Sequence, residues 1–195
     1  MKEKMLTPEE SILLITRTIE DTKNRFRENG HIILLWGFLM FVVTLSQYIL
    51  LRMELYRIHW YPNFLYPLGA VYTFVYFLKE HKKHNLPRTI IGNIIGALGW
   101  LLGANFMILG FFFSQKLGEA IAPVFLIFLA LFTFVSGIAI RFRPLIIGGI
   151  VLNLTGIATF YFDWIYHLLI MSIGSVIALI IPGILLNRES KKEDV

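Results

Sequence analysis

Asp163 and His167 are the two side chains whose types and spacing best suit chemistry. They stand four residues apart, so a helix beginning at Asp163 places both on one face. Such a pair could bind a metal ion or share a proton, and His59 with Glu54 could complete the site. Asp163 equally suits the cap of a helix, and no Gly-rich phosphate loop or His-Glu-x-x-His motif is present. We therefore predict no catalytic residues, no metal and no cofactor, and we keep an interfacial hydrolase as one alternative.

Three asparagines, Asn93, Asn105 and Asn153, interrupt long apolar stretches and form a second candidate group. They could line a polar path for a neutral or lipid-like substrate, or they could join neighbouring helices by hydrogen bonds. No Asp, Glu, Lys, Arg or His lies near the middle of any of these stretches. Because proton relays and ion-coupled carriers depend on such groups, the sequence argues against an ion pump.

Glycines recur on one face of segment 89–113, at spacings of four, three, four and seven residues. Small residues let helix backbones approach closely, so this face predicts a tight contact within one chain or between copies of it. Segment 145–162 has a shorter counterpart, and we predict that the two segments pack together. The residues are Gly92, Gly96, Gly99, Gly103 and Gly110 in the first segment, and Gly149, Asn153 and Gly156 in the second.

Six apolar stretches must position these residues. The chain has 195 residues, 56% of them hydrophobic, and a mean hydropathy of +0.68, which exceeds the norm for soluble domains. A bilayer core about 30 Å thick needs roughly 20 apolar residues per helix. The runs are too long for strands and do not alternate apolar with polar residues. The sequence therefore predicts an all-α integral membrane bundle of six transmembrane helices, at 31–51, 61–78, 89–113, 120–140, 145–162 and 164–186.

The basic residues predict the orientation of this bundle. Of the 18 Lys and Arg residues, 15 lie in the two termini or in the second and fourth gaps between the stretches. The remaining three, Arg52, Arg57 and Lys116, lie in the first and third gaps. An excess of Lys and Arg marks the cytoplasmic side, so we predict a multi-pass protein of the bacterial inner membrane with both termini in the cytoplasm. This placement explains the net charge of +5 without nucleic acid and makes membrane lipids the expected partners. Possible contacts to lipid head groups are Lys79, Lys82, Lys83, Arg88, Arg141 and Arg143.

Residues 1–30 predict a cytoplasmic amphipathic helix before the first span. Thr7 and Glu10 suit a capping box, with Pro8 in the first helical turn. Ile12, Ile15, Ile19 and Phe26 recur on one face, which could rest on the membrane or bind a protein partner. Residues 187–195 predict a charged cytoplasmic tail.

The first quarter of the chain resembles a family of small, uncharacterised bacterial membrane proteins. The resemblance rests on Glu10-Ser11 with Ile15, then Thr22-Lys23, then Leu34-Leu35-Trp36-Gly37 and Gln47-Tyr48. It implies a similar architecture and no particular activity, so no functional residue follows from it.

Two short fragments raise the hypothesis of an internal repeat. Residues 73–75 recur as 133–135, and residues 90–94 resemble 146–150. Parallel repeats of this kind occur in transporters.

Taken together, the sequence favours a noncatalytic membrane scaffold or regulatory partner that acts through packing, possible homo-oligomerisation or its N-terminal helix. A small transporter or channel and an interfacial hydrolase are the alternatives.

Overall fold

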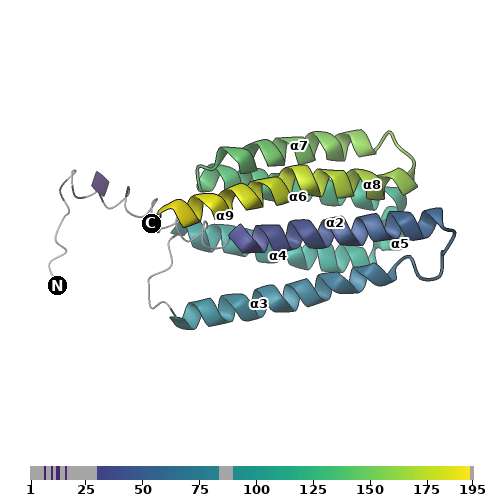
Figure 1. The fold of residues 1–195 in the computed structure, drawn as a ribbon, viewed down its shortest axis with the longest axis horizontal. Helices are drawn as coiled ribbons and strands as arrows, with labels where there is room; N and C mark the ends of the chain where they lie inside the picture. The colour runs from purple at the N-terminus through teal and green to yellow at the C-terminus, as the bar shows by residue number, and fades with distance from the viewer. Residues whose placement is uncertain are drawn as a thin grey trace.

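The computed structural model describes residues 30–83 and 90–193, together with residues 7, 10, 12, 13 and 16. No residue in this described part forms a β-strand. The long helices run side by side along one common direction (Figure 1). In chain order the elements are α2 (Gly30–Arg52), η1 (Tyr61–Phe64), α3 (Leu65–Lys83), α4 (Ile90–Phe112), α5 (Ser114–Leu117), η2 (Gly118–Ala120), α6 (Ile121–Ala139), α7 (Arg143–Thr159), α8 (Trp164–Ser175), η3 (Val176–Ile180) and α9 (Ile181–Glu193).

Four helices of the described part are long and apolar enough to cross a membrane, namely Gly30–Arg52, Gly92–Phe112, Ser114–Ala139 and Trp164–Arg188. Helix α7 is apolar but shorter, with 17 residues. Helix α3 ends in a charged turn after Leu78, which lowers its average hydropathy. The predicted all-helical fold is therefore confirmed for the described residues, with four helices long and apolar enough to cross a membrane, whereas the six crossings and the N-terminal amphipathic helix remain predictions.

Local sequence signals set several helix ends. Pro144 lies in the first turn of α7, where its missing N–H removes no intrahelical hydrogen bond. The predicted capping box is present: the Thr7 amide donates to Glu10 Oε2 at 2.9 Å, and the Glu10 amide donates to Thr7 Oγ1 at 3.2 Å. Most of the predicted amphipathic helix after this box lies outside the described residues.

The last predicted span is one continuous helix that contains a π-helical stretch, η3. The Ile181 amide donates to the Val176 carbonyl, five residues earlier. Pro182 follows directly and lacks the N–H that the Ala178 carbonyl would accept in a regular helix. The wider turn thus accommodates the proline. The helix then runs on to Glu193, so residues 187–193 of the predicted tail continue it.

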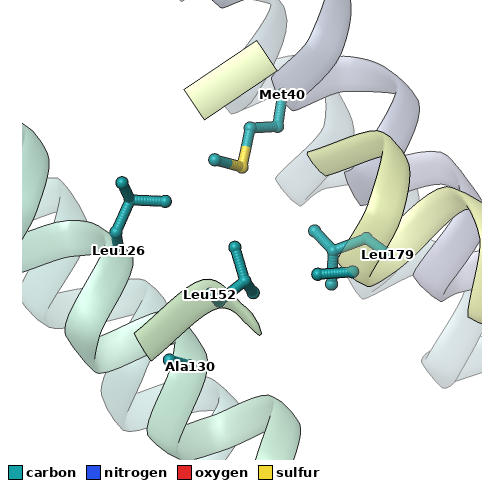
Figure 2. Close-up of a cluster of buried hydrophobic side chains, with 6 residues drawn as sticks. Met40, Leu126, Ala130, Leu152 and Leu179 are labelled. Atoms are coloured by element: carbon teal, nitrogen blue, oxygen red, sulfur yellow. The ribbon is translucent and has the colours of Figure 1, made fainter. Parts of the chain in front are cut away.

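The core lies between α2, α6, α7 and the continuous helix α8–η3–α9. Helices α6 and α7 form the most extensive helix pair, and α2 lies along α8, η3 and α9. At the centre, Leu126 and Leu152 are fully buried beside Met40, Ala130 and Leu179 (Figure 2). A second buried cluster near the α6–α7 turn joins α4 and α9 to this pair, through Ile95, Ile140, Phe142, Leu145 and Leu186.

Helices α3 and α4 lie at the edge of the bundle. Helix α3 is held against α2, where Trp36 Nε1 donates to Thr73 Oγ1 at 3.1 Å and Gly69 faces Leu39. Helix α4 packs on α6, and the Phe106 and Phe125 rings stack with centroids 4.3 Å apart. Figure 1 shows α3 at one edge of the bundle, on the side opposite α7. Many apolar side chains on α3 and α4 are therefore exposed, as expected for surfaces that face lipid.

One prediction about helix neighbours is wrong for the described chain, and the packing gives no support to the hypothesis of an internal repeat. The third and fifth predicted spans do not form a pair, because α4 packs on α6 while α7 packs on α6 and η3. The internal repeat would require α3 and α4 to pack as α6 and α7 do. Instead, the Phe74 ring meets the Trp100 ring edge-on at 5.8 Å, and no extensive α3–α4 contact accompanies it.

Candidate functional site

The described part of the chain does not gather the candidate metal ligands into a group of three or more. His167 is buried, and its Nε2–H donates to the Phe162 carbonyl at 2.7 Å, across the α7–α8 turn. His59 Nδ1–H similarly donates to the Tyr56 carbonyl at 2.7 Å, within the α2–η1 loop. Asp163 is exposed and precedes α8 as its N-cap residue, and its carboxylate accepts no capping hydrogen bond from the helix. Within the described ranges, no three His, Cys, Asp or Glu side chains lie close enough to hold a metal ion.

The three asparagines also lie apart. Asn93 and Asn105 are exposed on α4, whereas Asn153 lies on α7, and these helices do not pack together. Asn105 Nδ2 donates to the Leu101 carbonyl of its own helix at 2.9 Å, and within the described residues it makes no hydrogen bond to a neighbouring helix. Neither the polar path nor the set of interhelical bonds predicted from the sequence forms among them in the described structure.

Four buried hydroxyl groups in the bundle bond to their own helices, whereas the buried Ser136 Oγ has no hydrogen-bond partner within the described residues. Thr44 Oγ1 donates to the Met40 carbonyl, and Thr133 Oγ1 donates to the Leu129 carbonyl, both at 2.7 Å. Thr159 and Ser175 make the same kind of bond, also at 2.7 Å. Such backbone bonds satisfy a hydroxyl without a partner on another helix. Contacts between helices in the core are consequently made largely by apolar side chains and glycines.

Several glycines lie where two helices approach closely, and some of them were not singled out from the sequence. Gly149 and Gly156 of α7 lie against α6, as glycines at a tight contact should. Gly148 lies against the Ala178 carbonyl of η3, and the pair Gly37 and Gly183 brings α2 close to the last helix. Their small size was visible in the sequence. Their partners were not, because a glycine reveals nothing of the surface that it meets.

The predicted glycine face of α4 is largely open. A Cβ built on Gly96 or Gly103 would meet nothing within 4 Å, and one on Gly99 would meet only the Phe132 ring, at 3.5 Å. This face therefore makes no tight contact inside the described chain around Gly96 and Gly103. A contact between copies of the chain along it, which would also involve Gly92, remains a prediction.

The candidate head-group ligands gather at one end of the bundle. Arg141 and Arg143 are exposed at the α6–α7 turn, and Lys79 is exposed near the end of α3. Figure 1 shows this turn and the ends of α3 and α9 at one end of the bundle, with the α2–η1 loop and the α7–α8 turn at the other. Lys82 and Lys83 fall in the last turn of α3, whereas Arg88 lies outside the described residues. The arrangement provides cations at the depth where anionic head groups would lie in a bilayer.

No protein-family model, curated protein or solved structure matches this chain.

Proposed function

We propose that the chain is a six-span protein of the bacterial inner membrane, with both termini in the cytoplasm, that acts as a noncatalytic scaffold or regulatory partner. Its basic residues support the orientation, since Lys79, Arg141 and Arg143 are exposed at the end of the bundle opposite Arg57 and Lys116. The exposed apolar faces of α3 and α4 suit contact with lipid tails. The resemblance of the first quarter to small bacterial membrane proteins agrees with this placement.

One observation supports the scaffold role: the buried hydroxyls of Thr44, Thr133, Thr159 and Ser175 bond to carbonyls of their own helices, and close glycine contacts join the helices. A transporter needs polar groups that converge on a path through the bundle, and a hydrolase needs a nucleophile or metal beside a base. A packed core of this kind instead suits a protein that presents surfaces to partners. The exposed side chains of Ile12 and Leu13, at 65% and 69%, give the cytoplasmic segment an apolar surface for such a partner.

Topology is tested with single-cysteine variants, because the chain contains no native cysteine. A membrane-impermeant maleimide applied to intact cells should label Glu54→Cys and Lys116→Cys. It should label Arg141→Cys and Arg188→Cys only after the membrane is opened. Equal labelling of all four in intact cells would contradict the orientation.

The scaffold role is tested by placing a photo-crosslinking amino acid at Leu13 of the full chain in cells. We expect one discrete protein adduct. The control carries the same group at Phe112, an exposed residue at the C-terminal end of α4. Adducts to lipid alone at Leu13 would contradict a protein partner at this segment. Purified protein in liposomes supplies the second measurement, since saturable uptake of a neutral solute would favour transport instead.

A further inference from the structure

Asn153 lies in an apolar groove on the outer side of the α6–α7 pair. The groove has a volume of about 270 Å³ and opens to the surroundings. Its deepest residues are small and buried, Ala130 on α6 and Gly149 on α7. Its rim is formed by large exposed side chains, with Leu131 at 52% and Leu154 at 62% exposure. The surface thus combines a hollow with adjacent protruding leucines.

The depth of Asn153 sets its amide apart from those of the other two asparagines. It stands ten residues after Arg143 in α7, about 15 Å along the helix, which is near the middle of a hydrocarbon core about 30 Å thick. Asn93 follows the start of α4 by only three residues and so lies near the head groups, where water is available. Asn105 already bonds to its own helix. Within the described residues, no hydrogen bond satisfies the Asn153 side chain.

An unpaired amide in hydrocarbon is costly, because lipid tails offer neither donors nor acceptors. The amide carries two N–H donors and one carbonyl acceptor, so it pairs best with a group that both donates and accepts. A lipid in the groove would present only its tail at this depth. In a dimer whose twofold axis runs along the membrane normal, the second copy would present its own Asn153 at the same depth.

We propose that two copies of this chain associate through their α6–α7 grooves, with the two Asn153 amides hydrogen-bonded to each other across a twofold axis. Each amide then donates to the carbonyl oxygen of the other. The leucine rim of one copy enters the hollow at Ala130 and Gly149 of the other, so a single surface serves both sides of an isologous contact. The inference rests on the membrane placement proposed above and is independent of whether the protein is a scaffold.

Disulfide crosslinking of single-cysteine variants in native membranes tests the dimer. We expect Leu131→Cys and Leu154→Cys to give a covalent dimer on mild oxidation. Ile173→Cys on α8 is the matched control, because Ile173 has the same 52% exposure as Leu131, a similar depth and no place in the groove. Equal crosslinking at all three positions would indicate random collision and would overturn the proposal, as would its absence at Leu131 and Leu154.

The amide is tested separately in the Leu154→Cys background. Asn153→Leu should weaken dimerisation about five- to tenfold, since two interhelical hydrogen bonds are lost. Asn153→Gln keeps both donor and acceptor and should retain most of the dimer. Unchanged thermal unfolding of the monomer excludes misfolding, and dimerisation unaffected by Asn153→Leu would overturn the role of the amide. Resistance to carbonate extraction is measured in parallel: loss of membrane insertion would refute the membrane placement, whereas an inserted monomer refutes only the dimer.

Discussion

The backbone of Gly149 on α7 approaches the backbone of Phe134 on α6 so closely that a Cβ at position 149 would lie 2.6 Å from the Phe134 amide nitrogen. Backbone atoms cannot turn aside as the end of a flexible side chain can. The contact lies within the most extensive helix pair of the bundle, beside the groove that contains Asn153. Glycine at this position therefore sets how near α6 and α7 can lie.

Gly149→Ala should lower the free energy of unfolding by about 1–3 kcal/mol, because the added methyl group forces the two backbones apart. The control is Gly103→Ala on α4, where a Cβ meets nothing within 4 Å. This control should leave stability unchanged or raise it by up to about 1 kcal/mol through helix propensity. Unfolding of the purified protein in detergent, followed by circular dichroism, measures both. Equal effects of the two substitutions would contradict the assignment of the close contact.

The hydrogen bond from Trp36 to Thr73 should contribute to the attachment of α3 to α2. We expect Trp36→Phe and Thr73→Val each to destabilise the protein, and the double variant to lose less than the sum. The coupling should be about 0.6 kcal/mol, the average for interhelical hydrogen bonds in membranes. A double-mutant cycle on unfolding free energies gives this coupling directly. Strict additivity would mean that the bond contributes nothing.

Arg141 ends α6 in a left-handed backbone conformation, with a φ of 55°. The Arg141 amide donates to the Ile138 carbonyl at 3.1 Å and the Phe142 amide to the Gly137 carbonyl at 2.9 Å, which is the Schellman pattern. Because glycine adopts this conformation without strain, Arg141→Gly should raise stability by about 1 kcal/mol in uncharged detergent.

Arg141→Ala is the matched control, since it removes the same charge but keeps a Cβ, and it should give no such gain. If the Arg141 guanidinium binds head groups, anionic lipid should stabilise both variants less than it stabilises the unmodified protein. A gain as large for alanine as for glycine would show that charge, rather than backbone conformation, sets the effect.

Leu126 is fully buried at the centre of the bundle, beside Leu152 and Met40 (Figure 2). Leu126→Ala should cost about 2 kcal/mol or more, because the surrounding helices cannot close the cavity completely. Leu131→Ala on the exposed side of the same helix is the control and should change monomer stability by less than about 0.5 kcal/mol. Thermal unfolding of the two variants in detergent compares them, and similar losses would place Leu126 outside the packed core.

Helix positions were largely predictable from this sequence. The stretch predicted at 31–51 is α2 at Gly30–Arg52, and the stretch at 120–140 contains α6 at Ile121–Ala139. The prediction succeeds because a helix satisfies its backbone hydrogen bonds within its own segment, so local apolarity, charged ends and proline reveal it. The capping box at Thr7 and Glu10 was visible for the same reason.

Neighbours in the bundle were not predictable in the same way. In hydrocarbon, one apolar helix face resembles another, and what distinguishes a packed face from a lipid-facing one is the shape of the surface that meets it. The glycine series on α4 and the glycines of α7 look alike in the sequence. Only the former is open at Gly96 and Gly103, because α6 contacts α4 through aromatic rings beside those positions.

The sequence by itself therefore determined the helical segments, their apolar character and the separation of basic from apolar regions, all of which depend on residues near one another in the chain. The tertiary structure alone decided that Gly149 meets Phe134, that His167 bonds to a backbone carbonyl, and that Asn153 faces an apolar groove. These contacts depend on the shape and orientation of helix surfaces that are distant in the chain. They are therefore set only when the helices pack.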